Sequence, residues 1–122
     1  MTCEDIDDIV YELCLKNKCY PSPLRYSNFP KCVTTSVNNV AVHGIPDSRP
    51  LLEGDIISID VSVFVGTDSN GHHGDCCHTF AVGECDPAAK HLVSCSGGAS
   101  SRCLSTNAFA SSITSFSVDV CG

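Results

Sequence analysis

A histidine and two aspartates, each in a short motif, are the residues of this chain best suited to chemistry. His43 begins the motif HGIPD, Asp60 lies in the apolar run IDVSV, and Asp75 closes the motif HGD. An ionised carboxylate in an apolar strand is costly unless a cation or hydrogen-bond donors meet it. Two such carboxylates on neighbouring strands would repel each other, and a shared metal ion removes that repulsion. The trio therefore predicts part of a metal site.

Each of these residues also has a structural interpretation. Asp60 could be a core carboxylate held by hydrogen bonds, and His43 could simply belong to a Gly-Ile-Pro-Asp turn. The remaining histidines are expected on the surface or behind the site, and the early acidic residues are expected to be the solvated start of a helix. These two sets are His72, His73, His78 and His91, and Glu4, Asp5, Asp7 and Asp8.

A hairpin is the element that must position the two aspartates. The run from Ile56 to Val65 predicts a ten-residue strand, because its odd positions are all apolar and its even positions are mixed. A loop rich in turn formers spans residues 66–71, and residues 72–82 are predicted to return as the partner strand. Such a hairpin can bring Asp60 and Asp75 to the same side of the sheet.

The flanking segments complete the predicted α+β organisation. Thr2 and Asp5 form a variant capping box before an apolar helical face, and the YPSP sequence at 20–23 ends that helix. Residues 33–37 and 40–42 alternate as strands do, with a turn or bulge at 38–39 between them. From Ser94 to Ser117 the chain holds nine serines without a clear period, so this segment is expected to be coil.

Composition narrows the class of protein. At 122 residues the chain is one domain at most, and a net charge of −7 argues against nucleic acid and anionic membranes as partners. No apolar run is long enough to span a bilayer, and the acidic start does not resemble a leader peptide. The ten cysteines contain no Cys-x-x-Cys pair, so free thiols in a reducing compartment are expected rather than disulfides or a zinc site.

The motifs YPSPL, FPK, TSVN, HGIPD, GDI, IDV and HGD, in this order, resemble those of type I methionine aminopeptidases. The similarity runs from about Thr2 to Val93. It implies the N-terminal half of a pita-bread fold over residues 1–93, with antiparallel hairpins and a leading helix, followed by a tail over 94–122. The sequences SVNNV and DSRPL are more similar to the organellar form than to the cytosolic one. The expected location is the mitochondrion or the cytoplasm.

The resemblance also implies a chemistry. Such enzymes remove the initiator methionine from nascent proteins with two divalent metal ions, which can be cobalt, manganese, iron or zinc. By resemblance Asp60 and Asp75 are metal ligands, His43 contacts the scissile peptide, and Tyr26 and Phe29 line the methionine pocket. The implied partners are N-terminal methionyl peptides or nascent polypeptides, with no nucleic acid or membrane, and the implied state is a monomer.

The chain departs from the family pattern at several ligand and pocket positions. One histidine and two glutamates of the five ligands have no counterpart, since no glutamate follows Glu84, and Thr34 stands where a pocket cysteine is common. The sequence therefore predicts a C-terminally truncated member that is inactive as an isolated chain. Two alternatives stay open. One is a non-catalytic binding module of the same fold, and the other is an unstable by-product that exposes its internal interface.

Overall fold

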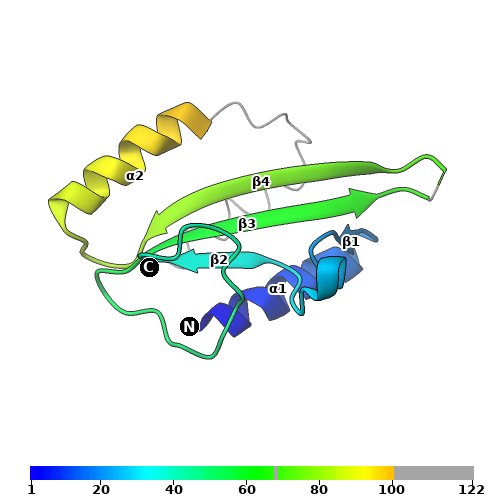
Figure 1. Ribbon diagram of the computed structural model, residues 1–122, viewed down its shortest axis with the longest axis horizontal. Coiled ribbons are helices and arrows are strands. Elements are labelled where there is room, and N and C mark those ends of the chain that lie inside the picture. The colour runs from blue at the N-terminus through cyan, green and yellow to red at the C-terminus, as the bar shows by residue number, and fades with distance from the viewer. Residues whose placement is uncertain (68, 101–122) are drawn as a thin grey trace.

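A single antiparallel sheet with one helix packed on it forms the body of the molecule (Figure 1). The computed structural model describes residues 1–67 and 69–100, the last five of them by their backbone alone. Along the chain the elements are α1 (Cys3–Lys16), β1 (Tyr20–Pro21), a short 3-10 turn η1 (Tyr26–Asn28), β2 (Thr34–Val37), β3 (Ile56–Val65), β4 (His72–Ala81) and α2 (Pro87–Ser100). The predicted α+β class is confirmed.

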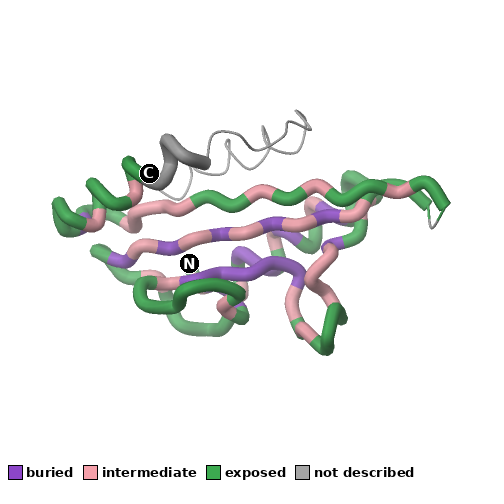
Figure 2. The backbone as a smooth tube through the Cα atoms, turned by 45° about the horizontal axis from the view of Figure 1, so that its top comes forward, coloured by how far each residue is buried: buried purple, intermediate pink, exposed green. Residues whose placement is uncertain are grey.

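Strand β3 is the centre of the sheet. It pairs along its whole length with β4, while β1 and β2 share its other edge at opposite ends (Figure 1). The side chains at the odd positions 57, 59, 61 and 63 are buried and those between them are half-buried, as the alternating colours of Figure 2 show. The predicted hairpin is confirmed, with β4 ending one residue before the predicted boundary.

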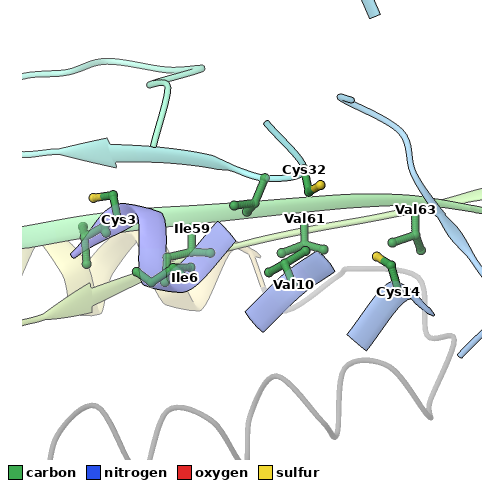
Figure 3. Packing of buried hydrophobic residues seen from close by; sticks show 10 residues of the cluster. Cys3, Ile6, Val10, Cys14, Cys32, Ile59, Val61 and Val63 are labelled. Atoms are coloured by element: carbon green, nitrogen blue, oxygen red, sulfur yellow. The ribbon is translucent and has the colours of Figure 1, made fainter. Parts of the chain in front are cut away.

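Helix α1 covers the apolar face of β3. The Thr2 hydroxyl accepts a hydrogen bond from the Asp5 amide, and the Asp5 carboxylate accepts one from the Thr2 amide, so the predicted capping box is present. Its buried side chains meet those of β3 and Cys32, as Figure 3 shows for Ile6 and Val10. This contact is the hydrophobic core of the described chain.

One acidic residue of the helix start is not solvated, so that prediction is wrong for Asp7. Its Oδ1 accepts a hydrogen bond of 2.6 Å from the Cys32 amide, and its Oδ2 lies 3.6 Å from the Lys31 Nζ. Asp7 is buried, whereas Asp8 is exposed. A buried carboxylate needs such partners, and Asp7 ties α1 to the segment that enters β2.

Two predicted segments differ in the structure. Residues 40–42 are not a strand, because Asn38 takes a φ of 53° and the chain turns away from β3, leaving Val42 exposed. Residues 94–100, predicted to be coil, belong instead to α2, which continues to Ser100. Asp86 caps this helix by accepting from the Ala88 amide, and Pro87 suits its first position. The rest of the predicted tail, residues 101–122, lies outside the described residues.

Two further observations concern the cysteines and the helices. No disulfide joins the cysteines within the described residues. In the same part of the chain, no helix is both long enough and apolar enough to cross a membrane.

A buried carboxylate at the start of β3 makes acid stability a test of the fold. Asp55 accepts two hydrogen bonds from the Arg49 guanidinium and one each from the Leu52 amide and the Asn38 side chain. The bonds from Arg49 above all, and then that from Leu52, lower the pKa of Asp55 to about 2 from an ordinary 3.8.

A lowered folded-state pKa contributes stability above the unfolded pKa, and this contribution is lost as the pH falls towards the folded value. We therefore expect the urea midpoint to fall between about pH 4 and about pH 2. The Asp55→Asn variant should be less stable at neutral pH and show a smaller decline in that window, whereas Asp8→Asn should follow the wild type. Equal declines in all three proteins would contradict this assignment.

Candidate metal and substrate site

The five residues predicted for the site line one cavity. It has a volume of about 560 Å³ and lies beside the mixed face of β3, within the usual range for small-ligand sites of about 300–1,000 Å³. Its walls contain His43, Tyr26, Phe29, Asp60 and Asp75, which come from four separate segments of the chain.

The sheet register places the two carboxylates diagonally across the hairpin. Asp60 lies opposite Cys77, and Asp75 lies opposite Ser62, two residues further along β3. Both side chains therefore project from the same face, at the diagonal spacing of about 7–8 Å between Cα atoms. The Ser62 hydroxyl donates a hydrogen bond of 2.7 Å to the Asp75 Oδ1, which fixes one of the two carboxylates.

The environment of Asp60 disfavours its ionised form. Burial, the charge of Asp75 and a hydrogen bond with Asp75 raise the pKa of Asp60, and the nearby His43 partly offsets this. A hydrogen bond between two carboxyl groups requires a proton on one of them. A divalent cation would supply positive charge in place of that proton, so the pair fits a cation better than it fits two free charges.

The donor set suits a hard divalent metal. Carboxylate oxygens are the ligands preferred by magnesium, manganese and calcium, and they also serve in sites of softer metals. Within residues 1–67 and 69–100, no group of three or more His, Cys, Asp or Glu side chains is arranged to hold a metal ion. The described residues thus offer two carboxylates, and a metal centre built on them would need further donors.

His43 reaches the cavity from a tight loop. Its φ of 54° is left-handed, a conformation that costs a non-glycine residue on the order of 1 kcal/mol or more and that clusters at functional sites. The next residue, Gly44, accepts a hydrogen bond of 2.9 Å from the Thr35 amide and donates one to Ser36. These contacts with β2 hold His43 at the cavity.

The wall with Tyr26 and Phe29 is a strained turn after β1. Arg25, Ser27 and Asn28 all have left-handed φ values, and the Arg25 amide donates to the Phe29 carbonyl at 2.8 Å. Tyr26 is 76% exposed, so its ring stands at the open side of the cavity. Aromatic rings in such a place suit an apolar ligand group.

The sequence missed several polar residues of the cavity. His73, expected on the surface or behind the site, lines it, and its Nδ1 lies 3.0 Å from the Ser22 hydroxyl. Ser62 lines it as well, and so does Thr34, which the resemblance to the family placed at a pocket position. The period-2 pattern of β4 places His73 on the face of Asp75 and could have indicated its position, but its Ser22 partner lies 51 residues away in sequence.

Gly44 offers a test of how the His43 loop is held. A Cβ at this position would clash with the Thr35 carbonyl oxygen, so an alanine must push the loop away from β2. We expect Gly44→Ala to lower the free energy of unfolding by about 1–3 kcal/mol, the usual cost of overpacking. Urea unfolding measures this, with the exposed Ser48→Ala as the matched control. An unchanged stability, or an equal loss in both variants, would contradict the tight packing of this loop.

The chain is similar in sequence to known metallopeptidases. Residues 1–113 match the metallopeptidase family M24. Over 93 residues the chain is 56% identical to the human protein "methionine aminopeptidase 1D, mitochondrial", covering 76% of this chain and 27% of that protein. It is 53% identical to the "chloroplastic/mitochondrial" methionine aminopeptidase 1D of Arabidopsis thaliana, with 76% and 25% covered. The chain therefore spans about a quarter of the length of these relatives.

Solved structures give the same fold. The methionine aminopeptidase of Rickettsia prowazekii superposes with a TM-score of 0.69 at 33% identity, covering 77% of this chain and 36% of that chain. The enzyme of Thermotoga maritima superposes with a TM-score of 0.67 at 32% identity, with 75% and 36% covered. The predicted match to the N-terminal part of the pita-bread fold is confirmed.

Proposed function

The chain belongs to metallopeptidase family M24, and from that premise we propose that the protein containing it removes the N-terminal methionine of nascent polypeptides. The observation that carries the proposal is one cavity that gathers two carboxylates, a histidine and two aromatic rings from separate segments. The activity for which the human and plant relatives are named agrees with it.

Asp60 and Asp75 would hold divalent metal ions, together with donors from the part of the fold that the described residues do not supply. Two ions of cobalt, manganese, iron or zinc are the proposed cofactors. Bound divalent metal lowers the pKa of water from about 15.7 towards about 7 and polarises carbonyl groups. The raised pKa of Asp60, caused by burial and then by the charge of Asp75, supports this assignment, because a nearby cation would offset both causes.

The chain's own residues would bind and orient the peptide. Tyr26 and Phe29 would contact the methionine side chain, which is apolar and is suited by an uncharged, hydrophobic lining. His43, held over the cavity by the Gly44 contacts, would donate a hydrogen bond to the peptide carbonyl where negative charge develops. Each role is thus matched to what that side chain can offer.

The proposed partners are N-terminal methionyl peptides. The proposed location is the mitochondrion, which is named for both relatives. A net charge of −7 supports a peptide rather than a nucleic acid as partner. We propose that residues 1–93 form the N-terminal half of the catalytic domain and that the protein is a monomer. Sedimentation of the purified chain tests the last point.

The experiment is to continue residues 1–93 of this chain with the C-terminal part of the human relative and to supply manganese or cobalt. Metal-dependent release of methionine from Met-Ala or Met-Gly peptides is the expected result. The matched control carries Asp75→Asn in the same hybrid and should release at least about a hundredfold less, since a metal ligand is lost.

A folded hybrid that releases no methionine with metal supplied would overturn the proposal. It would instead favour a binding module of the same fold. A hybrid whose release is unaffected by Asp75→Asn would overturn the role of the carboxylate pair, although the aminopeptidase activity itself would stand.

A further inference from the structure

The C-terminal end of α1 brings two cysteines together. Asn17 is the C-cap of α1, and Lys18 takes a left-handed φ of 54°. The Lys18 amide donates to the Leu15 carbonyl at 3.2 Å, and the Cys19 amide donates to the Cys14 carbonyl at 3.0 Å. This pair of bonds is the Schellman motif. In this motif the two residues whose backbone bond spans five positions commonly touch through their side chains.

The two residues joined by the five-position bond, Cys14 and Cys19, are both free cysteines. The Cys19 thiol donates to the Cys14 carbonyl at 3.6 Å, so its sulfur lies against the residue that carries the other thiol. Cys14 is 1% exposed and points into the core towards β3 (Figure 3), whereas Cys19 is half-buried. One thiol is therefore accessible to solvent and the other is held directly behind it.

We propose that Cys14 and Cys19 are a redox-modification site, which hydroperoxides convert to a disulfide across the end of α1. In the first step the Cys19 thiolate attacks the outer peroxide oxygen, giving a sulfenic acid and releasing an alcohol. In the second step the Cys14 sulfur attacks the Cys19 sulfur and the sulfenic oxygen leaves as water with the Cys14 proton. Two thiols and one hydroperoxide thus become one disulfide, one alcohol and one water.

The order of the two steps follows from burial. Burial above all, and then Cys19, raise the pKa of Cys14 to about 12, and burial raises that of Cys32 to about 11. These two thiols stay protonated at neutral pH and are poor first nucleophiles. The half-buried Cys19 meets the oxidant first, and Cys14 is the cysteine whose carbonyl its sulfur contacts.

The disulfide would act on the cavity wall. Cys19 leads directly into β1, which pairs with β3 at Phe64 and Val63. The next residue, Ser22, donates its amide to the Ser62 carbonyl and lines the cavity. A covalent link between Cys19 and α1 would therefore tie this wall to the core of the molecule.

Peptide mapping tests the pairing in the full chain. Lys16, Lys18 and Arg25 are trypsin sites, so cleavage separates Cys14 in peptide 1–16 from Cys19 in peptide 19–25. After treatment of the native chain with tert-butyl hydroperoxide and alkylation of the remaining thiols, we expect these two peptides as the dominant cross-linked species. The same treatment in urea should scatter the pairings over many cysteines.

Peptide 1–16 also contains Cys3, so Cys3→Ser is the matched control and should leave the cross-link intact. Cys14→Ser should abolish it and leave a Cys19 sulfenic acid that dimedone traps. If Cys14→Ser does not fold, Cys19→Ser serves instead, and peptide 1–16 should then stay fully alkylatable after unfolding. A dominant Cys19–Cys32 or Cys14–Cys32 link, or no link in the native chain, would overturn the proposal.

Discussion

An Asp60→Asn chain is expected to bind Mn²⁺ at least about tenfold more weakly than the wild type and yet to be more stable without metal. The first effect follows because an amide oxygen carries no charge, and even changes behind a ligand cost about 10–100-fold in metal affinity. Isothermal titration of the purified full chain measures this effect. Since the described residues supply two carboxylates, the wild-type affinity itself should be modest.

The second effect has the opposite sign. Asp60 is half-buried, and the charge of Asp75 raises its pKa, so the metal-free fold holds two carboxylates in an unfavourable arrangement. An asparagine keeps the shape and the hydrogen-bonding capacity while removing one charge. We expect a gain of about 0.5–2 kcal/mol in the free energy of unfolding, the usual size of a stabilising replacement at a functional site.

The exposed Asp8→Asn on α1 is the control for the general effect of removing one negative charge from an acidic chain. It should change neither the metal affinity nor the stability by a comparable amount. If Asp60→Asn were destabilising and bound Mn²⁺ as tightly as the wild type, Asp60 would be a structural carboxylate. The sign of the stability change thus separates the two interpretations that the sequence left open.

The hairpin could be predicted because its signal is local. The period-2 pattern of β3 specifies which side chains face α1, and the turn residues between the strands specify where β4 begins. The diagonal position of Asp60 and Asp75 could not be predicted, because it depends on how many residues the loop leaves unpaired. A shift by a single residue would have moved Asp75 to the other face.

Contacts between distant segments were the ones that sequence patterns did not reveal. Asp7 has the same type and setting as Asp8, but it is buried because the Cys32 amide, 25 residues away, needs an acceptor. His73 joins the cavity through Ser22, from the other side of the sheet centre. In both cases the partner is supplied by tertiary packing, about which neither residue's neighbours carry information.

The Cys14–Cys19 pair is intermediate between these cases. The helix and its end at the YPSP sequence were predictable, but the left-handed Lys18 was not, because a lysine has no special preference for that conformation. Once Lys18 takes it, the Schellman bonds follow and bring the two thiols together. Sequence patterns that look for Cys-x-x-Cys pairs miss a pair that is five residues apart.

Replacing Ile57 by alanine is expected to cost about 2–5 kcal/mol of unfolding free energy, the range for truncating a fully buried aliphatic side chain. Ile57 is 1% exposed on the apolar face of β3, in the cluster that α1 covers. Small domains have total stabilities of about 5–15 kcal/mol, so this loss is a large part of the total. Denaturant unfolding followed by circular dichroism measures it.

Val65→Ala is the matched control, because Val65 belongs to the same strand but is 52% exposed. It should cost less than about 1 kcal/mol, since little apolar surface is lost from the core. Equal and small effects of both substitutions would mean that the isolated chain lacks a packed core. That outcome would favour the unstable by-product, because a side chain that is not packed leaves no cavity when it is shortened. A large effect confined to Ile57 would instead establish that the contact between α1 and β3 holds the chain in one folded state.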